Sequence, residues 1–243
     1  MVDVTIEGGI ARIFLNRPEK VNALTSSILG KLEETFRALA ANESIRAVVL
    51  GGRGKAFCGG ADVGELSGLD ASSAGAFVER IHLVCEALRR LPVPVVARLH
   101  GAVIGAGLEI AAACDLRIAA EGTKFAMPEV RLGIPSVVEA ALLPRLMGCG
   151  RAAWMVLTGE AIDARRAYEW GLVEEICPPS QLEERLESLL QDLLAGERET
   201  LRVQKQLLQL WDEAPLSTSV AASIERFARS YACGVPASRM KNK

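Results

Sequence analysis

Alternating hydrophobic and polar residues open the chain, and helical spacing follows. Residues 2–7 and 10–15 alternate on either side of a Gly-Gly pair, which predicts a β-hairpin. Over residues 25–41 the apolar side chains recur every three or four positions, which predicts an amphipathic helix. The apolar run at 47–50 then predicts a short buried strand. The chain therefore begins with strands and a helix around one core.

The middle of the chain repeats a strand–loop–helix order. This order favours parallel strand pairing and a mixed α/β core over residues 1–180. After residue 180 the pattern is only helical, which predicts a helical C-terminal part over residues 181–243. The expected middle elements are a helix at 71–91, a strand at 95–100, a helix from 106, strands at 115–120 and 172–177, an extended piece within 123–135, and helices at 137–148, 150–158 and 163–171. The expected C-terminal helices are 180–195, 197–213 and 216–232.

Composition narrows the function classes. The chain has 243 residues, 50% of them hydrophobic, and a formal net charge of -2, so it lacks the basic bias of a nucleic-acid-binding protein. No apolar run is long enough to span a bilayer, and the N-terminus lacks the basic and apolar regions of a signal peptide. We therefore expect a cytoplasmic protein that binds neither nucleic acid nor membrane.

The cysteines and histidines argue against a zinc site. Six cysteines are scattered without a C-x-x-C pair, and the chain has only two histidines, so clustered zinc ligands are missing and we expect no metal. We expect these cysteines to be reduced and buried. A Ser-His-Asp hydrolase is disfavoured because no G-x-S-x-G sequence is present.

A glycine-rich stretch at 101–109, GAVIGAGLE, is the first candidate for chemistry. It follows the strand expected at 95–100 and is typical of a tight turn and a helix start, where backbone N–H groups lack partners and attract negative charge. Glu109 lies about one helical turn after Ala106, so its carboxylate can reach the same side. A packing role for the glycines is the alternative. A second small-residue loop at 59–62 follows the strand at 47–50, and an ordinary loop capped by Asp62 is its simplest interpretation.

Together these segments resemble the crotonase family, the enoyl-CoA hydratase/isomerase superfamily. The resemblance covers nearly the whole chain and keeps the order of the family's motifs. It implies a crotonase-like spiral of ββα units whose C-terminal helices cover the site. The matching segments are NRPEKVNAL (16–24), GRGKAFCGGADVGEL (52–66), GAVIGAGLEIAAACDLRIAA (101–120), FAMPEVRLGIP (125–135) and LTGEAIDARRAYEWGLVEEI (157–176).

The resemblance also implies roles for particular residues. The backbone N–H groups of Ala61 and Ala106 would hold the thioester oxygen of an acyl-CoA as an oxyanion hole, and Glu109 and Glu129 would be the catalytic carboxylates. Coenzyme A is then part of the substrate, and no separate cofactor is expected. The substrate-binding positions implied are Lys20, Val21, Ala23, Gly59, Asp62, Val63 and Glu139.

Three departures from the family pattern bear on the substrate. Ala106 stands where many hydratases have glycine, and Gly64 stands where some carry a lysine near the CoA phosphates. The loop after Gly133 lacks the glycine-rich run of short-chain hydratases and brings Glu139 and Ser136 toward the expected acyl pocket. Glu139 is either a helix-start residue or a third carboxylate that alters the reaction or the acyl group. The positions that could balance the CoA phosphates are Lys20, Arg17, Arg53 and Lys55.

The resemblance implies an enoyl-CoA hydratase, which adds water reversibly to a trans-2-enoyl-CoA. The alternatives are a Δ3,Δ2-enoyl-CoA isomerase, another acyl-CoA thioester reaction such as hydrolysis or decarboxylation, and a non-catalytic acyl-CoA-binding protein. Family members are commonly trimers or dimers of trimers. The apolar residues of the C-terminal helices also make a stable monomer unexpected: Leu207, Leu208, Leu210, Trp211 and Phe227.

Overall fold

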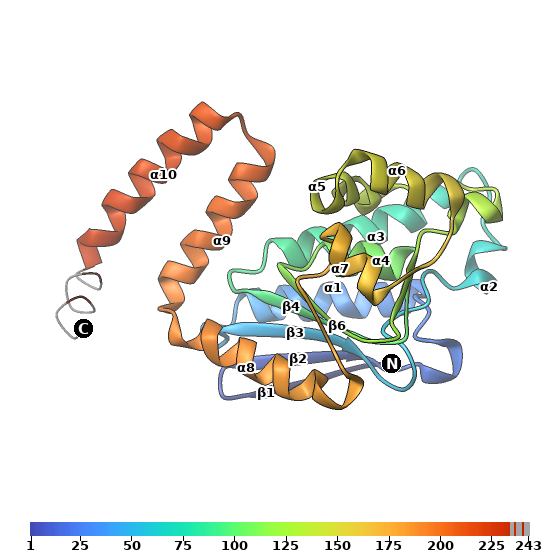
Figure 1. Ribbon diagram of the computed structural model, residues 1–243, viewed down its shortest axis with the longest axis horizontal. Coiled ribbons are helices and arrows are strands. Elements are labelled where there is room, and N and C mark those ends of the chain that lie inside the picture. Colours follow the sequence, from blue (N-terminus) through green and yellow to red (C-terminus); the bar gives the residue numbers. More distant parts are fainter. Residues whose placement is uncertain (234–235, 237–239, 241–243) are drawn as a thin grey trace.

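The central layer is a six-stranded sheet in the computed structural model, which describes residues 1–233, 236 and 240 (Figure 1). Its first two strands form the predicted hairpin, and every later pair is parallel. The third strand is buried along its whole length, which explains its uninterrupted apolar run. In spatial order the strands are β1 (Val2–Glu7), β2 (Ile10–Leu15), β3 (Ala47–Gly52), β4 (Val95–Leu99), β6 (Leu116–Ala120) and β9 (Glu175–Cys177).

A second sheet of three short strands lies beside the first within the described chain. It consists of β5 (Ala102–Ile104), β7 (Lys124–Ala126) and β8 (Ile162–Asp163). The sequence pattern indicated an extended piece at β7 but neither β5 nor β8. Strands of two or three residues are too short to show a period, and they form here because neighbouring segments supply their hydrogen-bond partners.

Helices cover both faces of the large sheet. On one face lie α1 (Ser26–Ala40), α3 (Ala74–Arg89) and α4 (Ala106–Ala112), and α8 (Leu182–Ala195) lies across the other (Figure 1). The burial pattern of the sheet follows this arrangement: Ile13 and Leu50 belong to the main core, whereas Val49 packs with Leu186 of α8. The predicted mixed α/β fold with a helical C-terminal part is therefore confirmed.

The helix expected at 137–148 is divided in two. The structure has a 3-10 turn, η3 (Val138–Leu142), followed by a short helix, α5 (Leu143–Met147). Pro144 lacks the N–H that a continuous α-helix would need there, so the first segment cannot extend through it. The remaining short elements are η1 (Pro18–Lys20), α2 (Val63–Leu66), η2 (Glu129–Leu132), α6 (Cys149–Thr158), α7 (Ala164–Trp170) and η4 (Pro179–Gln181).

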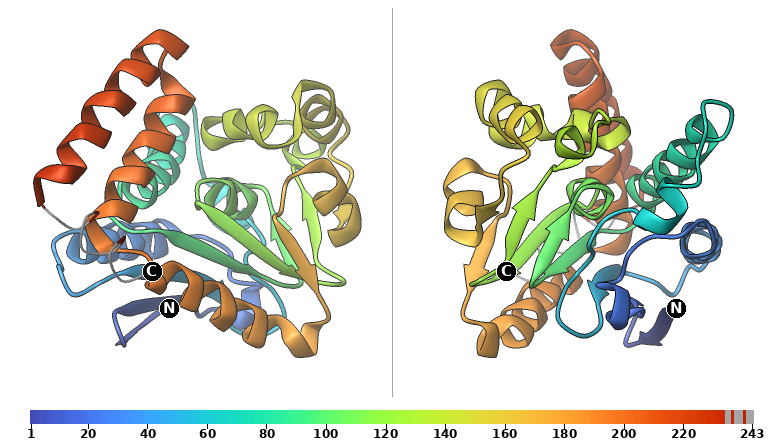
Figure 2. Two further views of the ribbon diagram at one scale, coloured as in Figure 1. Left: turned by 60° about the vertical axis from the view of Figure 1, so that its left-hand side comes forward. Right: turned by 90° about the vertical axis from the view of Figure 1, so that its right-hand side faces the viewer.

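The last helices, α9 (Arg198–Glu213) and α10 (Leu216–Ser230), form a pair that extends away from the sheet, and a 3-10 turn, η5 (Tyr231–Cys233), follows (Figures 1 and 2). Lys205 joins α9 to the body: its Nζ donates to the Val93 carbonyl at 3.0 Å and pairs with Asp115 at 2.7 Å. The domain division at residue 180 stays a prediction, and residues 234–235, 237–239 and 241–243 of its second part lie outside the described chain.

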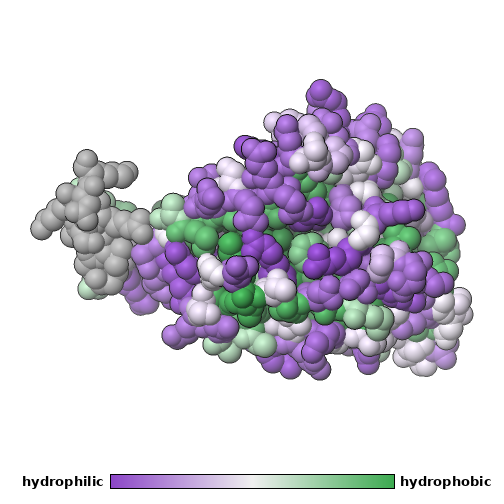
Figure 3. Space-filling view, turned by 90° about the horizontal axis from the view of Figure 1, so that it is seen from below, coloured by the Kyte–Doolittle hydropathy of each residue, from purple (hydrophilic) through white to green (hydrophobic). Residues whose placement is uncertain are grey.

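Among the described residues, no helix combines the length and the continuous apolar character that a membrane-spanning helix requires. The surface seen from the side of β1 and α8 is mostly hydrophilic and is interrupted by several apolar areas (Figure 3).

Candidate active site

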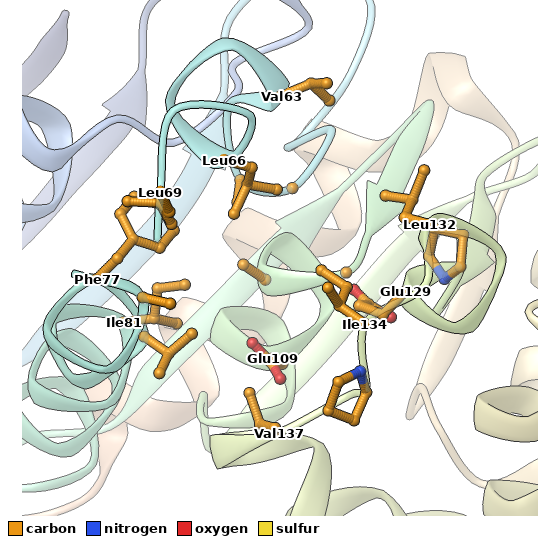
Figure 4. Close-up of a pocket in the computed structure, with 18 of the residues that line it drawn as sticks. Val63, Leu66, Leu69, Phe77, Ile81, Glu109, Glu129, Leu132, Ile134 and Val137 are labelled. Carbon is orange, nitrogen blue, oxygen red and sulfur yellow. The ribbon is translucent and has the colours of Figure 1, made fainter. Parts of the chain in front are cut away.

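A cavity of about 560 Å³ opens between α2 and α3 on one side and the segment from η2 to η3 on the other (Figure 4). Most of its wall is apolar. Glu109 and Glu129 reach the same cavity from different elements. The apolar wall residues are Val63, Leu66, Leu69, Phe77, Val78, Ile81, Ile104, Leu132, Ile134, Pro135 and Val137.

The floor of the cavity is made by the two small-residue loops. Ala61 and Ala106 both line it, and a bridge between Cys58 and Val103 holds the two loops side by side. The loops are so close that a Cβ on Gly60 would lie 2.9 Å from the Ile104 carbonyl oxygen. Within the described chain, neither the Ala61 nor the Ala106 N–H donates a hydrogen bond to a protein acceptor. Two free donors thus lie at the floor of an apolar cavity.

Glu109 projects from the first turn of α4, as its spacing from Ala106 predicted, and it is only 4% exposed. Burial raises the pKa of Glu109 to about 8; the negative charges of Glu129 and Glu139 act in the same direction, and the Ala140 backbone amide opposes them. The protonated form of Glu109 therefore predominates at pH 7, although the residue faces a cavity open to solvent.

Glu129 begins η2, lines the same cavity and is partly exposed. The Ser136 hydroxyl donates to its Oε2 at 2.9 Å. Its Oε1 lies so close to Gly105 that a Cβ there would be 2.4 Å away, and Gly105 also has a φ of +51°. Glycine at 105 therefore lets the Glu129 carboxylate lie against the start of α4.

The segment 16–24 supports the floor through Asn22, a role that the sequence analysis did not assign. Asn22 is fully buried, and its amide donates to the carbonyls of Arg53 and Ala56 at 2.9 and 2.8 Å. Its Oδ1 accepts from the Arg17 N–H at 2.8 Å. These bonds fasten the turn after β2 to the segment after β3, which leads into Ala61.

The predicted substrate-binding residues divide into two groups. Gly59 and Val63 line the cavity, whereas Lys20, Val21, Ala23, Asp62 and Glu139 are not among its lining residues. Asp62 instead caps α2 and pairs with Arg17 at 2.5 Å, and this bond is the main cause that lowers its pKa. The substrate-binding roles of all seven stay predictions.

Glu139 is a helix-start residue, in the first turn of η3, and it is not part of the cavity wall. It lies in η3, is 5% exposed, and its Oε1 is 2.8 Å from Nδ1 of His82 on α3. The side chain of His82 is half-exposed. No local pattern in the sequence links residues 57 positions apart, so this pairing was not predicted.

The wall residues on α3 were also missed as site residues. Phe77 and Ile81 belong to the apolar face that helical spacing predicts, so the sequence indicates that they are buried. Burial against a cavity and burial against a core give the same pattern. Only the position of the segment from η2 to η3 decides that they face an open space.

The cysteines offer no metal site and no low-pKa nucleophile at the cavity. The described residues contain no group of three or more potential metal ligands. Burial raises the pKa values of the Cys58 and Cys114 thiols to about 12. Cys149 is exposed, contrary to the expectation of burial, and the side chain of Cys233 lies outside the described residues.

Comparisons with known proteins agree with this geometry. The family model described as enoyl-CoA hydratase/isomerase matches residues 5–232. A short-chain-enoyl-CoA hydratase of Clostridium acetobutylicum is 31% identical over 93% of this chain and 87% of its own length. An enoyl-CoA isomerase/hydratase of Mycosarcoma maydis is 31% identical over 83% of this chain and 77% of its own.

A solved structure is similar over nearly the whole fold. The crystal structure of an enoyl-CoA hydratase of Mycobacterium smegmatis superposes with a TM-score of 0.92 at 32% identity. The match covers 94% of this chain and 90% of that one. The expected crotonase-like architecture is thereby confirmed.

Proposed function

The chain belongs to the enoyl-CoA hydratase/isomerase family, and on this premise we propose that it is an enoyl-CoA hydratase that acts on trans-2-enoyl-CoA thioesters. One observation carries the proposal: two free N–H donors and two carboxyl groups face one apolar cavity. An apolar wall suits an acyl chain, and convergent donors suit a thioester carbonyl. Relatives whose names contain hydratase support this choice.

In the proposed reaction, water adds across the C=C bond. Its oxygen forms a bond to Cβ, one carboxyl group accepts a proton from the water, and Cα receives a proton from the other. As the π electrons move toward Cα, negative charge develops on the thioester oxygen, where the N–H groups of Ala61 and Ala106 stabilise it. Glu109 can enter the reaction as the proton donor, because its pKa is raised to about 8, above neutral pH. Such an addition requires one proton donor and one proton acceptor.

We also propose that the protein needs no cofactor apart from the CoA carried by the substrate. Addition of water is redox-neutral, and acid–base groups with an oxyanion hole supply its chemical requirements. Addition of EDTA to the assay leaves the rate unchanged if this is correct. A cytoplasmic location stays a prediction from the sequence.

A direct assay tests the proposed activity. The purified protein is mixed with crotonyl-CoA and with longer and branched trans-2-enoyl-CoAs, and the loss of enoyl-thioester absorbance is followed. We expect a 3-hydroxyacyl-CoA product, identified by mass spectrometry as the substrate mass plus one water. Isomerised product from a 3-enoyl-CoA, with no hydration of any 2-enoyl-CoA, would instead identify an isomerase. Binding of every thioester without turnover would identify a binding protein.

The raised pKa of Glu109 predicts the alkaline side of the pH profile. Hydration needs the proton on Glu109, and this proton is lost as the pH rises through about 8. We therefore expect kcat/KM, which reports the free enzyme, to fall tenfold per pH unit above about 8. The measurement is the initial rate at low substrate concentration between pH 6 and 10. A rate that stays level to pH 10 would contradict the role of protonated Glu109.

We propose further that the protein assembles as a trimer or dimer of trimers through α9 and α10. Leu208 and Trp211 on α9 are about half exposed, and Leu207 is buried against the body instead. On α10 only Ser219 is buried, whereas the large apolar side chains are exposed: Leu216, Val220, Ile224 and Phe227. Tyr231, at the start of η5, is also exposed. An uncovered apolar face of this kind is typical of a subunit interface.

A charge on this face should prevent assembly. We expect Ile224→Glu combined with Phe227→Asp to shift the sedimentation coefficient from the oligomer to the monomer at micromolar concentration, because each charge would be desolvated in the interface. Thr218→Asp is the control, since Thr218 is an exposed polar residue of the same helix that lies off this apolar face. A wild-type protein that sediments as a monomer would refute the proposal.

A further inference from the structure

Glu139 occupies an unusual position for a carboxylate. It is 5% exposed, and it follows Val138, a β-branched residue whose φ of +40° is unfavourable for its side chain. Strained positions persist where the surrounding structure holds them. Here the strained residue is the one that turns η3 so that Glu139 enters the protein interior between α3 and α4.

Contacts from α3 hold this carboxylate in place. The imidazole of His82 lies 2.8 Å from Oε1, and the buried thiol of Cys85, one turn further along α3, also faces Glu139. Oε2 is buried and has no hydrogen-bond partner among the described residues. A buried carboxylate with one unpaired oxygen is uncommon and calls for an explanation. A functional role for the negative charge of Glu139 would explain why a carboxylate lies at this buried position.

The segment that carries Glu139, η3, packs against α4, the helix that carries Glu109. The backbone amide of the next residue, Ala140, donates to the Val137 carbonyl at 3.0 Å and also lies near enough to the Glu109 carboxyl group to lower its pKa; both η3 and α3 contact α4. We propose that Glu139 is a positioning residue for the acid–base pair: anchored by His82, its buried negative charge helps to hold the catalytic proton on Glu109 between turnovers. Glu139 does not line the cavity, so it acts through Glu109 and not on the substrate. This inference rests on the proposed function.

Electrostatics support the inference. Burial is the main cause that raises the pKa values of Glu109 and Cys85, and the negative charge of Glu139 acts in the same direction on both, because like charges disfavour ionisation. The other titratable groups around Glu109 are Glu129 across the cavity and the Cys85 and His82 side chains of α3.

The test is an infrared titration of the Glu109 carboxyl group, which needs no turnover. The band of the protonated acid is followed from pH 5 to 10, and subtraction of the Glu109→Gln spectrum isolates Glu109. In Glu139→Gln, which retains an oxygen to accept from His82, we expect the Glu109 transition to move to lower pH by about half a unit. A transition that stays in place, or moves to higher pH, would overturn the inference.

Two further variants complete the experiment. Glu86→Gln is the matched control, since Glu86 is also on α3 but pairs with Arg90, and it should leave the transition unmoved. If Glu139→Gln does not fold, His82→Leu replaces it, because loss of the imidazole removes the contact that holds the Glu139 carboxylate in place, and the same downward shift is expected. If the protein proves not to be a hydratase, the titration still decides whether Glu139 acts on Glu109.

Discussion

Replacement of Glu109 by glutamine is expected to lower kcat for the hydration of crotonyl-CoA by about 10²–10⁴-fold, the usual contribution of a general acid or base. Glutamine has the same shape but cannot exchange a proton. The residue is almost fully buried in the first turn of α4, and a side chain of the same shape should leave the backbone there unchanged. KM should change little, because the apolar wall and the N–H donors remain.

Glu129→Gln is expected to cause a loss of the same size, since the proposed addition uses both carboxyl groups in one step. The double variant should be scarcely slower than either single one, because groups that act as a unit are not additive. Glu121→Gln, in an exposed turn between β6 and β7, is the control and should retain the wild-type rate. Full activity in either single variant would refute the mechanism with two carboxyl groups.

Gly60→Ala is expected to lower kcat by about 10²–10³-fold, the cost of losing one oxyanion-hole donor. Gly60 has a φ of +97°, and its added Cβ would lie 2.9 Å from the Ile104 carbonyl oxygen and 3.8 Å from the Ala106 nitrogen. The two loops must therefore separate, which moves the N–H of Ala61 away from that of Ala106. The transition state should be affected more than substrate binding, so kcat should fall more than KM rises.

The control for this prediction is Gly122→Ala. Gly122 has a comparable φ of +87°, but an added Cβ would meet no atom within 4 Å. It therefore carries the same type of backbone strain without the contact between loops. A similar loss of rate in both variants would show that strain alone, and not displacement of the donors, accounts for the effect at Gly60.

The periodicity of the sequence determined most of the fold. The hairpin, the long helices and the parallel strands all appear where alternation and helical spacing predicted them. These elements bury one face or are buried throughout, so the spacing of their apolar residues indicates which positions are buried. The strands β5 and β8 are too short to show such a spacing. The sequence prediction also missed the break before α5, although Pro144 is a helix-breaking residue at that position.

The candidate site was determined in part by the sequence and in part by the tertiary structure. The sequence placed Ala106 and Glu109 on one helix start, because a helical turn fixes their relation. The resemblance added Ala61 and Glu129, which no local rule connects to them. Only the folded chain shows that four separate segments meet at one cavity, and that burial there leaves Glu109 protonated.

The link between His82 and Glu139 marks the limit of sequence reasoning most clearly. Histidine in a helix and glutamate in a loop are ordinary residues by themselves, and their contact depends on how η3 turns at Val138. Side-chain periodicity reports whether a position is buried, but it does not report what it is buried against. The sequence therefore determined the elements and the chemical groups available, and the tertiary structure decided which of those groups face one another.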